Sequence, residues 1–556
     1  MKKLAIKMNL WAKSTALLLG VSAMVSCSGF LEEEVVSQIG NNYLNTPKGL
    51  NDGVNAAYST MRTWYGTERG NNFTTFGTDL FTNGADGSWK FMNTYTNQFD
   101  SQNGHVRELW DQFYQGINTC NAVIDRSANV TGVSEAVVLQ RISEAKFIRA
   151  HHYFIMVQLF GAIDLQLSET TGPTKEVTRT PVAAIYAAII KDLQEAIPNL
   201  EAKAKSSDYG RATRPAAEHL LGRVYLTKGT SEAGEAADYG KAETLLKSVI
   251  DNYGFSLLPD FGDVHGFGNE INNEVIWSTQ YTYDPLTTGG GNNAHVFFLM
   301  EYDVQPGMQR DVENGRPYKR FRSTDYTLNT IFADRVNDSR YKNTYVDHFL
   351  SNKPGTYNTT FDKSKASVTY ARGDTTIWLP GYNMTEAERA KYPYQVLTPE
   401  LYTERLFPPM KKQKDPGRAD RTQFAGGRDY IAMRLADTYL LLAEAQFRQG
   451  KIDLATENIN VVRRRAAFPG KEADMEISES ELTFEFITEE RARELIGEQT
   501  RWLDLIRWGI LVERVKAYNP QGAPNIQDFH TLRPIPQNQI DRAEGNASAF
   551  PQNPGY

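Results

Sequence analysis

The chain has 556 residues and a formal net charge of −7, and its acidic and basic side chains are interspersed. It has no cluster of basic residues of the kind that nucleic-acid binding requires, so we exclude that class of protein. Aromatic residues make up 11% of the chain. This proportion predicts that some rings lie on the surface, where they contact a ligand or a partner.

The first residues predict an export signal. Four lysines fall within the first 13 residues, and an apolar run follows at 16–25. This run is too short to cross a bilayer, which needs about 20 apolar residues, so it indicates a secretory signal rather than a membrane helix. The run ends in Met24-Val25-Ser26-Cys27, which resembles a lipoprotein signal although Met24 stands where Leu is usual. The alternative is an ordinary signal peptide with an incidental cysteine.

Cys27 is the predicted lipidation site, and residues 1–26 are the predicted signal peptide. An acyl anchor holds a soluble domain at the outer membrane without spanning it. The acidic residues Glu32–Glu34 resemble the surface-export signal of lipoproteins in some bacteria, so we expect the protein to face the cell exterior. Cys120 is the other cysteine of the sequence. If Cys27 is acylated, no intramolecular disulfide can form, and the core alone must supply stability.

Helical periodicity begins after a polar tether that ends near Gly40. Apolar residues from Leu50 to Met61 follow the spacing of an amphipathic helix. Residues 66–104 are rich in Gly, Asn and Thr, and we predict a loop there. Further helices are predicted at Leu109–Ile124, Val138–Phe160, Val182–Leu200, Pro215–Thr227 and Lys241–Asp251.

The pattern changes in the middle of the chain. From about residue 271 to 427 helical periods fade, and two strand-like runs occur at Glu274–Gln280 and Tyr345–Leu350. Helices are predicted again at Arg428–Arg448, Ile452–Arg465 and Thr488–Trp508.

Small residues recur where the predicted helices would cross, which favours tetratricopeptide-like pairs. We therefore predict a mainly α fold, in which such pairs form one continuous body with a long loop-rich, partly β insertion. The N-terminal helical region is 27–270, and the C-terminal region 271–556 contains the insertion.

Polar and aromatic residues in the predicted loop, with Trp64 and Tyr65 just before it, are the best candidates for a ligand site. A flat ring can stack on the apolar face of a sugar, while amides and carboxylates can bind its hydroxyl groups. We single out Trp89 with Asn93 as such a ring and amide. The alternative for each ring is packing in the core. The first candidate set is Trp64, Tyr65, Asp79, Asn83, Asp86, Trp89, Phe91, Asn93 and Tyr95.

The sequence predicts a binding protein and not an enzyme. Glu490, Arg491 and Asp504 lie near opposite charges on predicted helices, which favours ion pairs over a catalytic carboxylate pair. Interleaved arginines would also keep the pKa of Glu494 low. The sequence has no His-x-x-x-His, cysteine cluster or Gly-x-Ser-x-Gly motif, so no cofactor or catalytic metal is expected. Structural calcium is possible, because Asn/Asp-rich loops could supply oxygen ligands.

Several segments, taken together and in order, resemble one known family. They are Leu109–Ile124, Glu144–Gly161, Arg211–Leu226, Arg434–Ala445, Glu489–Trp508, Leu532–Pro536 and Gln552–Tyr556. In this respect the chain resembles the SusD/RagB family of outer-membrane nutrient-binding lipoproteins, which is named after protein D of the starch-utilisation system. The segments are spread over nearly the whole mature chain.

The resemblance implies a lid over a SusC-like TonB-dependent transporter. Such a lid captures a nutrient, here most simply a glycan or oligosaccharide, and delivers it into the barrel. Capture of peptides, as in RagB-like members, is the first alternative; a surface glycosidase and a purely structural scaffold are others. The family often places binding rings after the first half of the chain, so the second candidate set is Tyr281, Tyr283, Tyr302 and Trp378.

Overall fold

The computed structural model describes residues 43–172, 174–204, 208–359, 361 and 366–556. The predicted signal peptide and Cys27 lie outside the described residues. The helices are α2 (Pro47–Ser59), α3 (Glu68–Thr75), α4 (Phe91–Thr94), α5 (Gly104–Arg126), α6 (Glu135–Phe160), α7 (Val182–Ala196), α8 (Arg214–Gly229), α9 (Asp238–Asn252), α10 (Phe261–Val264), α11 (Ala294–Phe297), α12 (Arg340–Thr344), α13 (Glu386–Arg389), α14 (Leu435–Arg448), α15 (Ile452–Ala466), α16 (Glu472–Met475), α17 (Phe484–Leu495), α18 (Arg501–Arg507), α19 (Leu511–Tyr518) and α20 (Gln537–Arg542). The strands are β1 (Phe81–Asn83), β2 (Val275–Thr279), β3 (Phe321–Ser323), β4 (His348–Leu350), β5 (Gly355–Asn358), β6 (Ser367–Tyr370), β7 (Thr375–Trp378), β8 (Gln395–Val396) and β9 (Tyr430–Arg434).

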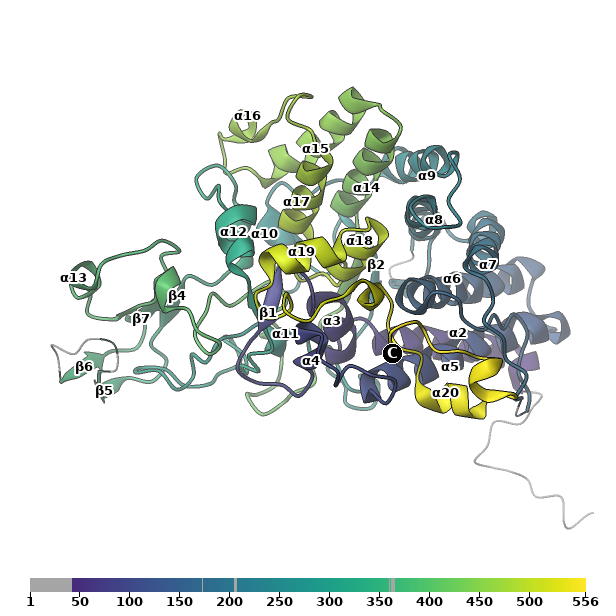
Figure 1. Cartoon of the computed structure of the whole chain (residues 1–556), viewed down its shortest axis with the longest axis horizontal. Helices are drawn as coiled ribbons and strands as arrows, with labels where there is room; N and C mark the ends of the chain where they lie inside the picture. The colour runs from purple at the N-terminus through teal and green to yellow at the C-terminus, as the bar shows by residue number, and fades with distance from the viewer. Residues whose placement is uncertain (1–42, 173, 205–207, 360, 362–365) are drawn as a thin grey trace, which may run out of the picture.

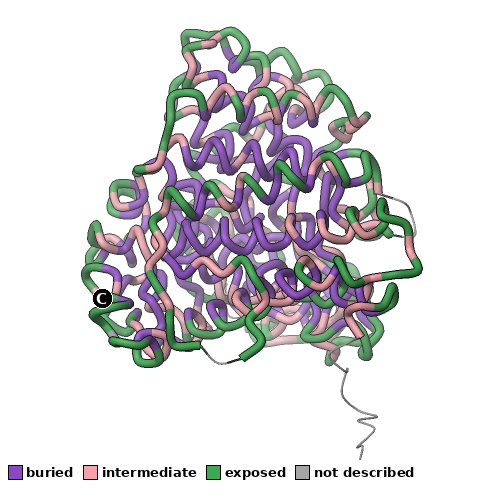
Figure 2. The backbone as a smooth tube through the Cα atoms, turned by 90° about the vertical axis from the view of Figure 1, so that its right-hand side faces the viewer, coloured by how far each residue is buried: buried purple, intermediate pink, exposed green. Residues whose placement is uncertain are grey.

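Helix pairs form the body of the molecule. Helix α6 packs against α7, α8 against α9, and α14 against α15. Helix α9 also packs against α14, which joins the N-terminal pairs to the C-terminal ones (Figure 1). Figure 2 shows that the buried residues lie in the middle of the molecule and the exposed residues around its edge. The predicted mainly α fold with tetratricopeptide-like pairs is confirmed.

The sequence explains why α8 and α9 pack closely. The Thr213 side chain accepts a hydrogen bond from the backbone N–H of Ala216 and so caps the start of α8. Gly222 faces the next helix, where an added Cβ would lie 2.8 Å from Cγ of Leu246. Only glycine permits this approach without moving α9, so the small residue at this crossing has a packing role.

The predicted loop at 66–104 contains regular structure, which corrects that prediction. Helix α3 begins at a cap, since the Thr67 side chain accepts from the N–H of Gly70. Asn71 and Asn72 are buried in this helix beside Phe73. Buried asparagines remove the apolar periodicity by which a helix is recognised in a sequence. Strand β1 and the short helix α4 follow within the same stretch.

Two predicted C-terminal helices are interrupted. The stretch 428–448 begins with strand β9, which pairs antiparallel with β2 and turns into α14 at Leu435. The stretch 488–508 is broken between α17 and α18, where Gly497 (φ 76°) and Gln499 (φ 56°) adopt left-handed backbone conformations. Of the two predicted strands, the first is confirmed as β2, and the second is limited to β4.

Charged residues of the C-terminal helices form a buried network. Arg434 contacts Glu274 at 3.1 Å, Glu494 at 2.6 Å and Glu498 at 2.8 Å. Burial alone would raise the pKa of Glu494, but the guanidinium groups of Arg465 and Arg434 outweigh it and lower the pKa to about 2. These ion pairs confirm the prediction that the charges of Glu489–Trp508 orient helices.

The insertion carries small sheets at one end of the molecule. Strands β4, β7 and β8 form a three-stranded sheet, and β5 pairs with β6. Both lie at the left of Figure 1, away from helices α5–α9 on the right. The three-stranded sheet covers a separate hydrophobic cluster that includes Met300, Tyr302, Phe349 and Ile377. Cys120 is a buried free thiol in the main core.

Within the described part of the chain, no helix has the length and hydrophobicity to cross a membrane.

Candidate functional site

A cleft of about 560 Å³ opens beside the start of α3, and we call it the α3 cleft. Three parts of the chain line it: the segment before and within α3, one face of α5, and the segment between β2 and α11. They contribute Arg62, Thr67, Arg69, Glu108, Gln112, Tyr281, Thr288, Gly289–Gly291 and Asn293.

Backbone contacts hold the segments of the cleft together. The N–H of Asn293 donates to the carbonyl of Gly66 at 2.8 Å, and the Asn292 side chain donates to the carbonyl of Arg428 at 2.9 Å. Gly66 has a φ of 76°, which favours glycine at this turn. The run Gly289–Gly291 also lines the cleft. Because glycine has no side chain, a ligand can approach the backbone closely there.

The side chains of the cleft are mainly polar. Arg62 donates to the carbonyls of Gln280 at 2.8 Å and Thr287 at 2.7 Å, and its guanidinium lies 5.0 Å from the ring centroid of Tyr281. Arg69 forms an ion pair with Glu108. The hydroxyl of Thr288 is buried and has no hydrogen-bond partner among the described residues. The cleft can therefore offer donors and acceptors to a hydroxyl-rich ligand.

An aromatic pair lies near the cleft residues Arg69 and Glu108. The ring of Trp89 is stacked on His105, with centroids 3.5 Å apart and 26° between the planes. Asn72 Nδ2 donates to Nδ1 of His105 at 3.2 Å, and burial, with a smaller effect of the Arg69 charge, lowers the pKa of His105 to about 3. His105 lies one turn before Glu108 on α5, so the pair adjoins the Arg69–Glu108 ion pair.

The loop that carries Trp89 is fixed by contacts with the segment before β3. The N–H of Gly84 donates to the carbonyl of Arg320 at 2.9 Å. Asp86 forms an ion pair with Lys319 at 3.0 Å, and Arg320 forms one with Glu68 at 2.8 Å.

Two more rings continue this surface. The guanidinium of Arg320 lies 4.9 Å from the ring centroid of Tyr318. Tyr318 is in turn stacked on Phe424 at 5.3 Å. The surface beside the α3 cleft therefore combines rings with paired charges.

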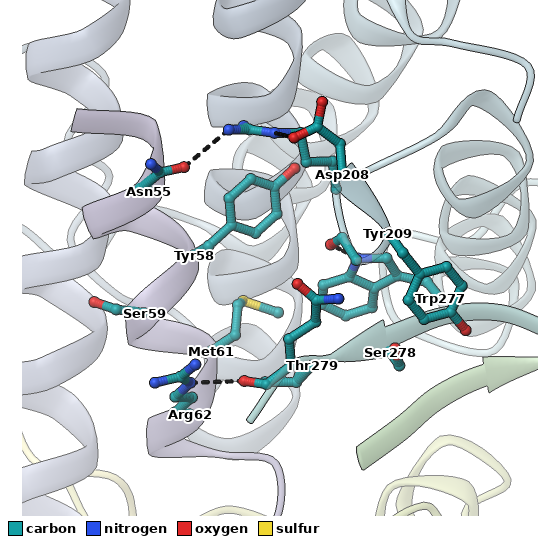
Figure 3. A pocket seen from close by; sticks show the side chains of 13 residues that line it. Asn55, Tyr58, Ser59, Met61, Arg62, Asp208, Tyr209, Trp277, Ser278 and Thr279 are labelled. Atoms are coloured by element: carbon teal, nitrogen blue, oxygen red, sulfur yellow. Dashed lines mark hydrogen bonds and ion pairs between the residues drawn. The ribbon is translucent and has the colours of Figure 1, made fainter. Parts of the chain in front are cut away.

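A second pocket of about 430 Å³ adjoins the cleft, because Ser59 and Arg62 line both (Figure 3). It lies between α2 and β2. Arg211 contacts Glu144 at 2.7 Å on one side, and the indole N–H of Trp277 donates to the carbonyl of Gly210 at 2.8 Å on the other. Its walls are rigid because many of their polar groups already bond to one another.

Most of the first candidate set is buried and faces the core, which corrects the prediction for those residues. Trp64 is 1% exposed and packs against Phe73 and Phe113. Tyr65 is 8% exposed, and its hydroxyl contacts His151 Nε2 at 3.0 Å. These rings have no face free for a ligand.

The polar members of that set are also structural. Asp79 forms ion pairs with Arg501 at 2.6 Å and Arg514 at 3.0 Å, which lower its pKa against the opposing effect of burial. The amide of Asn93 accepts from Gly77 and from Asn519, so the predicted pair of Trp89 with Asn93 is wrong in its second member. Asn83 and Tyr95 are buried as well.

The remaining candidates lie in three places. Trp89 is stacked on His105, Asp86 is paired with Lys319, Phe91 is packed edge-on against Trp89 at 5.7 Å, and Tyr281 lines the cleft. Tyr283 is 37% exposed, and its hydroxyl donates to Asp415 at 2.5 Å. Tyr302 is buried in the core of the insertion. Strand β7, which ends at Trp378, lies at the left end of the molecule (Figure 1).

Residues that the sequence analysis missed make up much of the site. Arg62, Arg69 and Glu108 come from different segments, and the sequence carries no shared motif for them. The run Gly289–Gly291 was the available signal, since three successive glycines indicate close approach to backbone.

Among the described residues, no group of three His, Cys, Asp or Glu side chains is placed to hold a metal ion. The expectation of a structural calcium ion therefore stays untested.

The model of the SusD family matches residues 272–556, slightly more than half of the chain. The chain belongs to the SusD family. A second family model, described as "Starch-binding associating with outer membrane", matches residues 29–226. SusD-like protein P25 of Formosa agariphila is 25% identical to this SusD family member over 545 residues, which is 93% of this chain and 94% of that protein.

Solved structures of other SusD-like proteins share the fold. A SusD homologue of Bacteroides thetaiotaomicron superposes with a TM-score of 0.71 at 21% identity, covering 93% of this chain and 98% of that one. A laminarin-binding SusD-like protein superposes with a TM-score of 0.66 at 21% identity, covering 92% of this chain and 100% of that one.

Proposed function

We propose that this protein captures an oligosaccharide or glycan in the α3 cleft and delivers it to a SusC-like TonB-dependent transporter. The observation that carries the proposal is the stack of Trp89 on His105 beside the polar cleft. A half-buried indole offers an apolar surface to the C–H groups of a sugar, and the cleft offers partners for its hydroxyls. A saccharide is the class of ligand that uses both features.

Membership of the SusD family supports a saccharide as the ligand. One family model is described as starch-binding, and one protein of the same fold is described as laminarin-binding. Both ligands are neutral glucose polymers, so we use such polymers as the first probes.

The proposed chemistry is binding without reaction. Glu108, the carboxylate of the cleft, is paired with Arg69. We assign this pair to holding ligand hydroxyls, because hydrolysis of a glycoside needs two carboxyl groups on opposite sides of one bond. Each ring stacked on a sugar contributes about 0.5–1.5 kcal/mol. A few such contacts give micromolar to millimolar affinity, which suits capture followed by release.

The proposed location is the outer face of the outer membrane, with an acyl anchor on Cys27. The support is the sequence around Ser26-Cys27 and the family description "associating with outer membrane". Incorporation of labelled palmitate by the intact protein but not by Cys27→Ala would establish the anchor. Equal labelling of both proteins would contradict it.

Calorimetry on the soluble protein beginning at Ser28 tests the ligand. The probes are laminarin and starch oligosaccharides, other neutral oligosaccharides, and a set of mixed peptides. We expect saturable saccharide binding that Trp89→Ala weakens. Binding of peptides alone would replace the saccharide proposal with peptide capture, and release of shortened saccharides during the titration would show that the protein is an enzyme.

A further inference from the structure

The sheet at the far end of the insertion has two different faces. Phe349 of β4 and Ile377 of β7 point inward and belong to the hydrophobic cluster around Tyr302. Their neighbours His348 and Trp378 point to the opposite side, because successive residues of a strand alternate between the two faces. His348 and Trp378 are direct partners across the two strands. Their rings lie 5.9 Å apart with 18° between the planes.

Three tyrosines gather around this pair. Tyr382 lies 6.3 Å from Trp378 at 83°, and Tyr392 lies 5.2 Å from Trp378 at 58°. Tyr394 extends the group, at 5.4 Å from Tyr392. We call these five residues, His348, Trp378, Tyr382, Tyr392 and Tyr394, the distal ring platform.

The strand that carries Trp378 is held on both sides. Trp378 pairs with His348 on β4 and with Val396 on β8. The N–H of Leu397 donates to the Trp378 carbonyl at 2.8 Å, and the N–H of Leu379 donates to the carbonyl of Asp347 at 2.8 Å. The central ring of the platform is therefore anchored to a paired strand.

The segment that carries Tyr382 is also fixed. Arg335 donates to the carbonyl of Gly381 at 2.8 Å, while its guanidinium lies 3.8 Å from the ring centroid of Tyr341. Gly381 has a φ of 77°, and an added Cβ would meet Arg335, so glycine is required at this point. The platform is thus held in place before any ligand arrives, which lowers the entropy cost of binding.

Folding does not account for these outward rings. The core of the insertion lies on the inward face, yet Tyr382 is 56% exposed and His348 is also exposed. Among the described residues, the Tyr382, Tyr392 and Tyr394 hydroxyls have no hydrogen-bond partner in the protein. Trp378, Tyr392 and Tyr394 are half-buried against one another. A cluster of partly exposed rings on a fixed frame marks a binding surface.

We propose that the distal ring platform is a second binding site for a neutral saccharide chain, separate from the α3 cleft. Its rings supply apolar faces for sugars, and its free tyrosine hydroxyls supply hydrogen bonds. The nearby charges of Glu400 and Arg389 are paired, since they lie 2.8 Å apart. The charge of a ligand would therefore add little to its affinity for this surface.

The position of the platform predicts a role in binding that differs from that of the α3 cleft. Strand β7 lies at one end of the molecule, whereas α3 and α4 lie near its middle (Figure 1). A long polysaccharide could contact both places at once, whereas a short oligosaccharide occupies one. Two linked contacts on one chain raise its apparent affinity without any new contact at either site.

The test uses the full mature chain in detergent and native gels that contain laminarin or soluble starch. The double variant Trp378→Ala/Tyr382→Ala is compared with the wild type and with Trp89→Ala. We expect the double variant to bind polysaccharide about tenfold more weakly, as the loss of one or two ring contacts implies. Calorimetry with a glucose hexasaccharide then measures binding at the α3 cleft. The double variant should keep the wild-type affinity for this short ligand.

The matched control is Leu350→Ala, because Leu350 is 54% exposed on the same strand as His348 but carries no ring. This control should migrate as the wild type does. The proposal is overturned if the double variant also migrates as the wild type does, or if Leu350→Ala weakens binding equally. A wrong proposal for the α3 cleft gives a different result. Trp89→Ala would then bind polysaccharide as the wild type does, while the platform variant would still bind it more weakly.

Discussion

The imidazole of His105 and the indole of Trp89 are stacked with their centroids 3.5 Å apart. His105 is fixed by Asn72, so the helical body sets the position of an indole that comes from a loop. This contact explains how Trp89, in the loop between β1 and α4, stays partly exposed while Asn83 and Asn93 on either side are buried.

Replacing Trp89 with Ala should weaken saccharide binding about tenfold, because one ring-to-sugar contact is lost. His105→Ala should weaken binding by a smaller factor in the same direction, since the indole remains but is no longer held. Calorimetry with the best oligosaccharide measures both. Phe267→Ala is the matched control, because Phe267 is 52% exposed and does not line the cleft. Equal losses in all three variants would show that the effect is not local to the cleft.

The ion pair of Arg69 with Glu108 should matter for binding and little for folding. Its side chains are 21% and 50% exposed. Such a pair contributes about 0.2–1 kcal/mol to stability. We expect Arg69→Gln, Glu108→Gln and the double variant to unfold in urea within about 1 kcal/mol of the wild type. Saccharide affinity should fall several-fold in each, and the double variant should lose less than the sum. Strictly additive losses would mean that the two side chains act independently.

Replacing Asp79 and replacing Asp86 by Asn should lower the free energy of unfolding by very different amounts. Asp79→Asn leaves the buried guanidinium groups of Arg501 and Arg514 without a carboxylate, which costs about 3–5 kcal/mol of unfolding free energy. Asp86 is paired with Lys319 near the surface, so Asp86→Asn should cost less than about 1 kcal/mol. Urea unfolding of the two variants measures the difference. If Asp79→Asn were as stable as the wild type, its assignment as a structural residue would be wrong.

The protein should lose stability as the pH falls below 6.5. Burial lowers the pKa of His152 to about 3 and that of His265 to about 4, from an ordinary value of 6.5. Below pH 6.5 the unfolded chain binds protons that the folded chain does not, so stability is complete above 6.5 and falls toward pH 4. Each such histidine contributes up to about 1.4 kcal/mol per pH unit in this range.

Urea unfolding at several pH values between 7.5 and 4.5 checks this slope. His152→Gln removes one of these buried histidines and should make the slope shallower. A rise in stability on acidification from pH 7 to 5 would contradict the assignment. Since His105 also stays neutral over this range, saccharide binding by the folded protein should change little between pH 5 and 8.

The α3 cleft shows which site residues a sequence can and cannot reveal. Trp89 and Asp86 are predicted ligand residues because they are a ring and a carboxylate in a polar, aromatic stretch without helical periodicity, and both remain partly exposed in the structure. Asn93 lies four residues from Trp89 and was predicted with equal reason. Its amide nevertheless bonds to Gly77 and Asn519. Residue Asn519 is far away in the sequence, so no local pattern could have shown that the amide was already occupied.

The sequence by itself determined the helical body, because regular apolar spacing and small residues such as Gly222 act within one helix or between neighbours. It also predicted that the charges in Glu489–Trp508 form ion pairs, but the tertiary structure supplied most of the partners, such as Asp79 for Arg501 and Arg434 for Glu494. Only the tertiary structure decided which rings are buried. Whether Trp64 or Trp89 faces solvent depends on partners such as Phe113 and His105, which reach them from another helix through the packing of the whole chain.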